Sequence, residues 1–235
     1  MFVEDRKELI LRLIIEDYIQ TAEPVGSKQL ADRHGLDFSS ATIRNEMVLL
    51  EQEGYLRQPH TSAGRIPTEK AYLYYLQNVV EPKKRSPSTQ DFHAERGLHE
   101  TEQETLRIFA KRLVEISGET ALVAFDPRSS YYVGVSNLLQ KPDFDDVELI
   151  RTISLLVDQF DEVMSRVYDR VQNDPVVYIG SQNPFGNPMA TILIRYHFSE
   201  AHEGLLGLVG PVRMDYAKNI ALLERAQELI AQIYD

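Results

Sequence analysis

Apolar positions in the first part of the chain recur with helical spacing. Residues 3–21 carry an apolar side chain every three or four positions with charged residues between them, which predicts an amphipathic helix. After a turn, a two-turn helix is expected, with Ser27 as its N-cap. It should stop at Gly35, because glycine readily takes the left-handed conformation that ends helices.

A third helix is predicted from Ala41 to about Gln52, capped by Ser39 or Ser40. Its apolar residues share one face, which should turn toward the core: Ile43, Met47 and Leu50. Three short helices so closely linked are typical of a helix-turn-helix unit.

Two β-prone stretches follow, at 55–58 and 64–67, and the polar segment between them favours a hairpin. A hairpin directly after the third helix would be a wing. A further helix is expected after Thr68, its N-cap, and the charged and proline-containing segment at 81–91 is the predicted linker. The pattern therefore predicts a winged helix-turn-helix domain over residues 1–80.

The remaining residues, 92–235, predict a domain of mixed helix and strand. Helical patterns occupy 95–117, 145–170 and 215–234. Strand-like runs lie between them, at 121–125, 131–139, 175–180, 190–198 and 204–210. This order fits an α+β or an α/β domain of the size of a sensor module.

Charge and composition restrict the functions that are open to the chain. The net charge of −11 argues against a protein that coats nucleic acid without regard to sequence. Residues 1–80 hold nine Lys and Arg against twelve Asp and Glu, so DNA binding there requires a few well-placed cations and acids turned away. Without cysteine, disulfides and thiolate metal sites are excluded. Because no apolar run approaches about 20 residues, we expect a soluble, cytoplasmic protein.

The predicted third helix carries polar residues at its N-terminal end, where a recognition helix meets base edges. Arg suits guanine and Asn suits adenine in the major groove, and hydroxyls and helix amides suit phosphate. The wing adds cations beside a polar tip. The candidate DNA contacts are Ser39, Ser40, Thr42, Arg44 and Asn45 on the helix, and Arg57, His60, Thr61, Ser62 and Arg65 on the wing. Taken singly, each has a plainer interpretation as a solvated turn or a surface charge.

Several segments resemble the heat-inducible transcription repressors of the HrcA type. They include DYIQTAEPVGSKQL and SSATIRNEMVLLEQEGYLRQPHTSAGRIPT in the first 75 residues, and YYVGVSNLLQKPDFDDVE, GSQNPFG and LLGLVGPVRMDYAKNIALL in the second half. The segment PHTSAGRIPT is highly specific, and the resemblance covers most of the chain.

The resemblance implies an α+β protein in which a GAF-like α/β domain follows the winged helix-turn-helix. It implies a dimeric repressor that binds an inverted-repeat operator upstream of chaperone genes, with its activity supported by a GroEL-type chaperonin. The family's DNA-contacting role carries over to Ser39–Asn45 and to wing residues 57–65.

One departure from the family concerns an inserted dimerising region, which is absent where ALVAFDPRSSYYVG runs through. A two-fold operator still calls for a dimer, because each subunit reads one half-site. We therefore expect the helices at 95–117 and 215–234 to pair between subunits, with ordinary core as the alternative. Their apolar stripes consist of Leu106, Phe109, Leu113, Ile220, Leu223, Ile230 and Ile233.

Enzymatic and metal-dependent functions find no support in the sequence. The histidines form no HExxH pair, and the usual nucleotide-binding and hydrolase motifs are missing, so we expect no catalytic set, metal or cofactor. Two alternatives stay open. One is a ligand-sensing regulator whose pocket would involve Tyr178, Arg195 and His197; the other is a protein-binding adaptor, which the acidic balance favours mildly.

Overall fold

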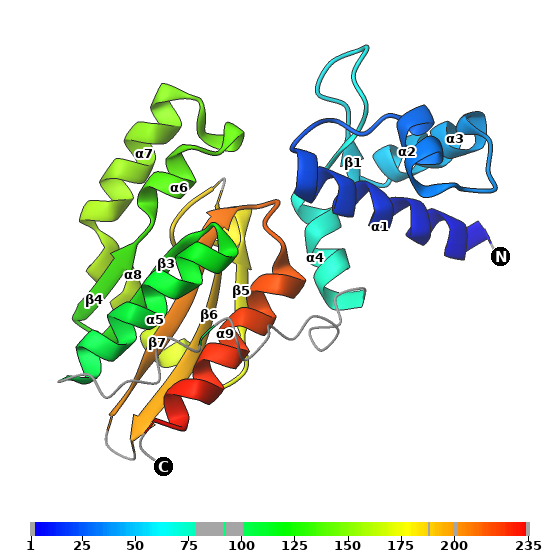
Figure 1. Ribbon diagram of the computed structural model, residues 1–235. Coiled ribbons are helices and arrows are strands. Elements are labelled where there is room, and N and C mark those ends of the chain that lie inside the picture. Colours follow the sequence, from blue (N-terminus) through cyan, green and yellow to red (C-terminus); the bar gives the residue numbers. More distant parts are fainter. Residues whose placement is uncertain (1–2, 79–91, 93–100, 188, 200–201, 234–235) are drawn as a thin grey trace. The chain divides into compact units, whose positions relative to one another are not determined.

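The chain divides by its internal contacts into two compact units, Met1–Val80 and Glu81–Asp235, and each is described by itself. The computed structural model in Figure 1 describes residues 3–78, 92, 101–187, 189–199 and 202–233. The linker predicted at 81–91 lies outside the described residues. Within those ranges, no helix is both long and apolar enough to cross a lipid bilayer.

Three helices open the N-terminal unit: α1 (Val3–Thr21), α2 (Ser27–His34) and α3 (Ser40–Gln52). The helix predicted over 3–21 is confirmed, and α3 begins one residue earlier than predicted. Ser39 caps α3, because its Oγ accepts a hydrogen bond from the amide of Thr42 at 3.1 Å.

The start of α2 corrects the predicted cap. Gly26 is the N-cap, with extended dihedral angles of φ −92° and ψ 146°, and Ser27 is the first helical residue. A cap residue must keep a non-helical backbone, and the chain path assigns that conformation to the glycine. The predicted end is confirmed: Gly35 takes the left-handed conformation at φ 57°, and its amide bonds the carbonyl of Ala31.

A short antiparallel hairpin follows α3. Strands β1 (Leu56–Arg57) and β2 (Ile66–Pro67) are shorter than the predicted stretches, and Leu56 lies opposite Pro67. α4 (Glu69–Asn78) begins after Thr68, whose Oγ1 lies 3.4 Å from the amide of Ala71, as expected of its N-cap. The three helices, the hairpin and α4 enclose one apolar core, which includes Ile10, Ile14, Leu30, Ile43, Met47, Leu50, Leu56, Ile66 and Tyr72.

The C-terminal unit is built on a five-stranded sheet in the order β4-β3-β7-β6-β5. Every neighbouring pair is antiparallel, which assigns the unit to the α+β class. The strands are β3 (Thr120–Asp126), β4 (Ser129–Val133), β5 (Val176–Ile179), β6 (Met189–Ser199) and β7 (His202–Pro211).

Helices cover both faces of this sheet. On one face, α5 (Glu102–Ser117) packs on β3 and α9 (Tyr216–Ala231) packs on β6, and these two helices contact each other (Figure 1). Alternate residues of the strands, such as Leu122 and Leu193, enter a second core with side chains from the segment between β4 and β5. That segment contains α6 (Val135–Leu139), α7 (Val147–Asp158) and α8 (Phe160–Val167).

Two predicted elements of this unit are wrong in their extent. The strand predicted over 131–139 ends at Val133, because Gly134 takes a positive φ of 89° and α6 begins after it. The helix predicted over 145–170 is divided into α7, α8 and a 3₁₀ turn at Tyr168–Arg170. Of the helix predicted at 95–117, residues 95–100 lie outside the described residues, and the remainder is α5 with Thr101 as its cap.

The apolar stripes of α5 and α9 form the core of one chain and are not available to pair between subunits. Six of the seven predicted side chains are buried within the unit: Leu106, Phe109, Leu113, Ile220, Leu223 and Ile230. Ile233 is half-buried. The alternative of ordinary core is therefore confirmed, since both stripes face the sheet and each other.

Candidate nucleic-acid interface

The N-terminal end of α3 presents a polar, exposed surface. Ser40, Arg44 and Asn45 are exposed, and Thr42 is half-buried. The hydroxyl of Ser39 lies 2.9 Å from Thr42 Oγ1 in addition to capping the helix, so these two hydroxyls hold each other in place. The five predicted helix residues therefore lie together at one end of α3.

The acidic side chains of α3 are turned away from this end and paired. Glu46 is only 3% exposed and accepts a hydrogen bond from Arg6 Nε at 2.9 Å, which joins α3 to α1. Glu51 accepts from Arg65 Nε at 2.9 Å, and Glu53 lies 2.7 Å from Lys7 Nζ just beyond the helix end. In these pairs the acids in and just after α3 are neutralised by cations of the same unit, while Arg44 stays exposed. This is the local arrangement that an acidic unit needs if it is to bind DNA.

The hairpin tip is exposed and internally ordered. Arg57, His60, Thr61 and Ser62 are all exposed. The side-chain amide of Gln58 donates to the carbonyls of Thr61 at 3.0 Å and Ala63 at 2.9 Å, which fixes the loop that carries the tip.

Arg65 differs from the other wing candidates because it faces the inside of its unit. Its guanidinium is half-buried against Glu51, and its backbone exchanges two hydrogen bonds of 2.9 Å with Val25. These contacts fasten the hairpin to α3 and to the segment before α2. Arg65 is thus separated from the exposed tip with which the sequence grouped it.

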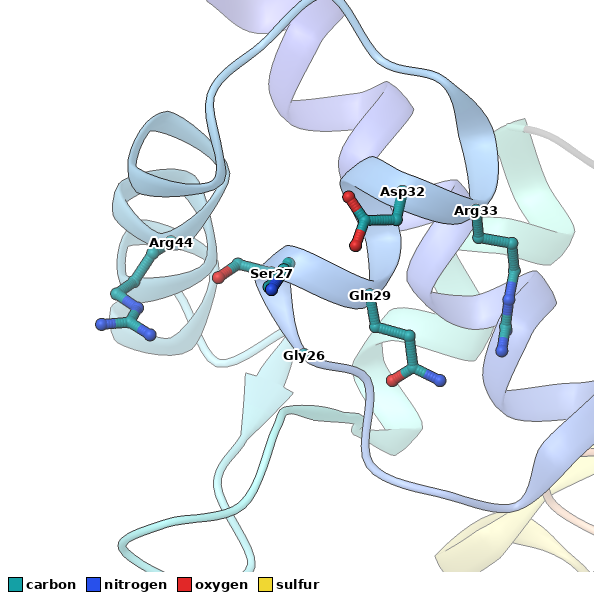
Figure 2. A pocket seen from close by; sticks show the side chains of 7 residues that line it. Gly26, Ser27, Gln29, Asp32, Arg33 and Arg44 are labelled. Carbon is teal, nitrogen blue, oxygen red and sulfur yellow. The ribbon is translucent and has the colours of Figure 1, made fainter.

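An open pocket lies between the start of α2 and α3, and we call it the α2–α3 pocket. Figure 2 shows its lining residues, which are Gly26, Ser27, Lys28, Gln29, Asp32, Arg33 and Arg44. Sequence reasoning selected Arg44 but missed Lys28 and Gln29. The sequence signal for these residues was a glycine before a helix, followed by a serine and a lysine. A glycine N-cap has no side chain to accept hydrogen bonds from the first amides of the helix, so those amides are available to a ligand.

The three residues considered for a ligand pocket in the C-terminal unit do not form one. Arg195 is 7% exposed and its guanidinium is occupied by the carbonyls of Tyr168 and Val171 and by Glu203. His197 is exposed and lies 2.9 Å from Asn173 Oδ1, while Tyr178 packs against the apolar core. Over the described ranges, no cluster of three or more His, Asp or Glu side chains is arranged to hold a metal ion.

A buried carboxylate lies where β3 begins in the C-terminal unit. Burial raises the pKa of Glu119 above its ordinary value of 4.5, although the ammonium group of Lys141 and the charges of Arg213 and Lys218 act in the opposite direction. A carboxyl whose folded-state pKa is raised contributes stability that is fully present below the unfolded pKa and is lost as the pH rises.

Glu119→Gln removes this titration while it keeps the shape of the side chain. We expect the free energy of unfolding of the wild type, relative to that of Glu119→Gln, to fall as the pH rises above 4.5, the ordinary pKa of the group. Urea denaturation of both proteins over a series of pH values measures the difference. A difference that grows with pH would contradict a raised pKa.

Comparison with known proteins connects the whole chain to one group. A family model described as HrcA protein C terminal domain matches residues 43–220. A curated relative from Halalkalibacterium halodurans, named Heat-inducible transcription repressor HrcA, is 27% identical over an alignment of 333 residues that covers 97% of each chain. A relative of the same name from Acetivibrio thermocellus is 59% identical over 81 residues, which cover 34% of this chain and 23% of that protein.

A solved structure shares the fold. The structure described as "Crystal structure of a hypothetical protein at 2.2 A resolution" superposes with a TM-score of 0.79 at 18% identity and covers 98% of both chains. The alignment with the Halalkalibacterium halodurans relative spans 333 residues, whereas this chain has 235. Segments of that relative therefore have no counterpart here, which agrees with the predicted absence of an inserted region.

Proposed function

The chain belongs to the HrcA family of heat-inducible transcription repressors, and from this premise we propose that it represses heat-shock (chaperone) genes by binding a specific DNA operator. The N-terminal unit would act as a winged helix-turn-helix, with α3 in the major groove and the hairpin tip along the backbone or in a minor groove. The C-terminal unit would be the GAF-like effector and dimerisation domain.

One observation carries this proposal: the exposed polar end of α3, with every acid of that helix paired inside the unit. A net negative unit can bind DNA when its acids are neutralised by neighbours and its free cations lie on the surface that meets phosphate. Ser40, Arg44 and Asn45 are the helix residues we propose to meet DNA. The tip residues Arg57, His60, Thr61 and Ser62 would add backbone contacts.

Arg65 has a positioning role in this proposal. Its bond to Glu51 and its backbone bridge to Val25 fix the angle between the hairpin and α3. Ser39 and Thr42 likewise fix the first turn of α3, and their hydroxyls lie close enough to the exposed end to reach a phosphate as well.

The test compares an inverted-repeat duplex with a scrambled duplex of the same length by fluorescence anisotropy. We expect the wild type to bind the repeat far more tightly, with two chains per repeat, because each subunit reads one half-site. Asn45→Ala should lose about 1 to 3 kcal/mol of the preference for the repeat, since it removes a bidentate contact to a base. Equal affinity of the wild type for both duplexes would contradict operator binding and favour the adaptor alternative.

We also propose that a GroEL-type chaperonin supports the active state, as the family resemblance implies. Addition of the purified chaperonin to the same assay should raise the fraction of protein that binds the repeat. The occupied fraction is the appropriate readout, because a chaperonin that restores folded protein changes the active concentration and leaves the dissociation constant of active molecules unchanged.

A further inference from the structure

The first turn of α2 has backbone donors without partners. Its N-cap is Gly26, which has no side chain to accept from them. Among the described residues, nothing accepts a hydrogen bond from the amides of Ser27, Lys28 and Gln29. The first amides of a helix have no partner within it, and together with the helix dipole they favour an anion.

The hydroxyl of Ser27 is a second, independent sign of a missing ligand. Ser27 is only 8% exposed, lines the α2–α3 pocket, and forms no side-chain hydrogen bond with any residue that the structure describes. Figure 2 shows this side chain directed toward the side of the pocket where Arg44 lies. Its oxygen is not one of the fully buried side-chain atoms, so the hydroxyl is accessible from the pocket and is available to donate to an acceptor there.

The charges around the pocket favour an anion as that acceptor. Arg44 and Lys28 are exposed and are in no ion pair with the described part of the chain, whereas Arg33 is 2.9 Å from Asp17 and is thereby neutralised. Asp32 is an acidic residue of the lining and opposes anion binding. With Arg33 neutralised by Asp17, Arg44 and Lys28 outweigh Asp32, so the lining of the pocket has a net positive charge.

We propose that the α2–α3 pocket binds a phosphodiester group of the DNA backbone, with the Ser27 hydroxyl and the first amides of α2 as donors and the Arg44 guanidinium as the cation. This rests on the proposed function and changes the expected role of Arg44. The sequence assigned it to a guanine, but a phosphate contact positions the protein without reading the base. Asn45 is exposed and is not part of the pocket lining, so it keeps the role of reading a base.

Binding of the full-length chain to the repeat and the scrambled duplex over a salt series tests the assignment. We expect Arg44→Gln to weaken binding to both duplexes by the same factor, about tenfold. It should also reduce the slope of log K against log salt by about 0.9, the value for one phosphate contact. Arg12→Gln is the matched control, because it removes one exposed cation of α1 that does not line the pocket, and it should change neither quantity.

Operators that carry a single neutral methylphosphonate identify the phosphate. Substitution at the contacted position should weaken the wild type about tenfold and weaken Arg44→Gln by a clearly smaller factor, because that variant has already lost the guanidinium contact and keeps only the Ser27 and amide donors. Ser27→Ala should weaken both duplexes by a smaller common factor. Circular dichroism checks that each variant retains the fold of the wild type.

Three results would overturn the assignment or the function behind it. If Arg44→Gln lowers affinity for the repeat alone, Arg44 reads a base and the pocket assignment fails while the proposed function stands. If inorganic phosphate binds at the amides of Ser27–Gln29 to saturation, as NMR shifts of those amides would report, and the affinity for both duplexes is unchanged, the pocket binds a free anion and the assignment to the DNA backbone fails. If the wild type binds both duplexes equally, the proposed function fails, and the salt slope of Arg44→Gln still decides whether the pocket contacts phosphate.

Discussion

Gly64→Ala is expected to destabilise the N-terminal unit by about 3 kcal/mol and to remove the preference for the operator. A Cβ atom on Gly64 would lie 2.4 Å from both the carbonyl carbon and the carbonyl oxygen of Val25. Both atoms belong to the backbone and cannot rotate away. The hairpin would have to separate from the segment before α2, which breaks the two 2.9 Å hydrogen bonds between Val25 and Arg65.

Amide hydrogen exchange at Val25 and Arg65 measures this effect where it arises, beside urea denaturation and operator binding of the full chain. Ser62→Ala is the matched control, because it changes an exposed residue of the same hairpin and should leave stability within about 0.5 kcal/mol of the wild type. Protected Val25 and Arg65 amides in Gly64→Ala would show that the hairpin tolerates the added methyl group.

The elements that the sequence predicts well are those determined by neighbours along the chain. The limits of α1, the cap of α3 at Ser39 or Ser40 and the end of α2 at Gly35 depend on spacing and capping within a few residues, and the structure selects Ser39 for α3. The predicted cap at Ser27 is wrong because Gly26 and Ser27 are both acceptable cap residues, so the local sequence does not decide between them. The bridge between Val25 and Arg65 holds the chain just before α2 and so influences which of them is extended.

Predictions failed where contacts between distant residues decide the outcome. Arg65 looks like a surface cation until its bond to Glu51 is known, and no periodicity reports that pair. The apolar run at 131–139 fits a strand or a buried helix equally well, and Gly134 at φ 89° divides it. The stripes of α5 and α9 correctly predicted burial, but a stripe does not say whether the covering surface belongs to the same chain.

In the candidate site as well, the sequence predicts what one helix determines and misses what two helices form together. The exposed end of α3 follows from the amphipathic pattern of one helix, so its five residues could be selected from sequence. The α2–α3 pocket combines the first turn of one helix with a side chain of another, and only the fold brings Ser27 and Arg44 together. The role proposed for Arg44 therefore changed once its neighbours were known.

Arg195→Met is expected to cost the C-terminal unit about 4 kcal/mol of its free energy of unfolding. The guanidinium joins β6 to the segment between α8 and β5: Nε donates to the carbonyl of Val171 at 3.0 Å, and Nη2 donates to that of Tyr168 at 2.5 Å. Methionine fills a similar volume but donates nothing, so two carbonyls lose their partner in a buried region. Each buried group left unsatisfied costs about 1 to 3 kcal/mol.

Glu203→Gln distinguishes the contribution of the hydrogen bonds between Arg195 and the two carbonyls from the contribution of its ion pair with Glu203. Glu203 lies 2.8 Å from Arg195 Nη1, but its side chain is 49% exposed, and an exposed partner contributes about 1 kcal/mol or less. Urea denaturation followed by circular dichroism should therefore place Glu203→Gln close to the wild type and Arg195→Met far below it. Equal losses in the two variants would mean that the stabilising contribution of Arg195 comes from its ion pair with Glu203 and not from its hydrogen bonds to the two backbone carbonyls. Contacts other than those with Arg195 would then hold the segment between α8 and β5 in place.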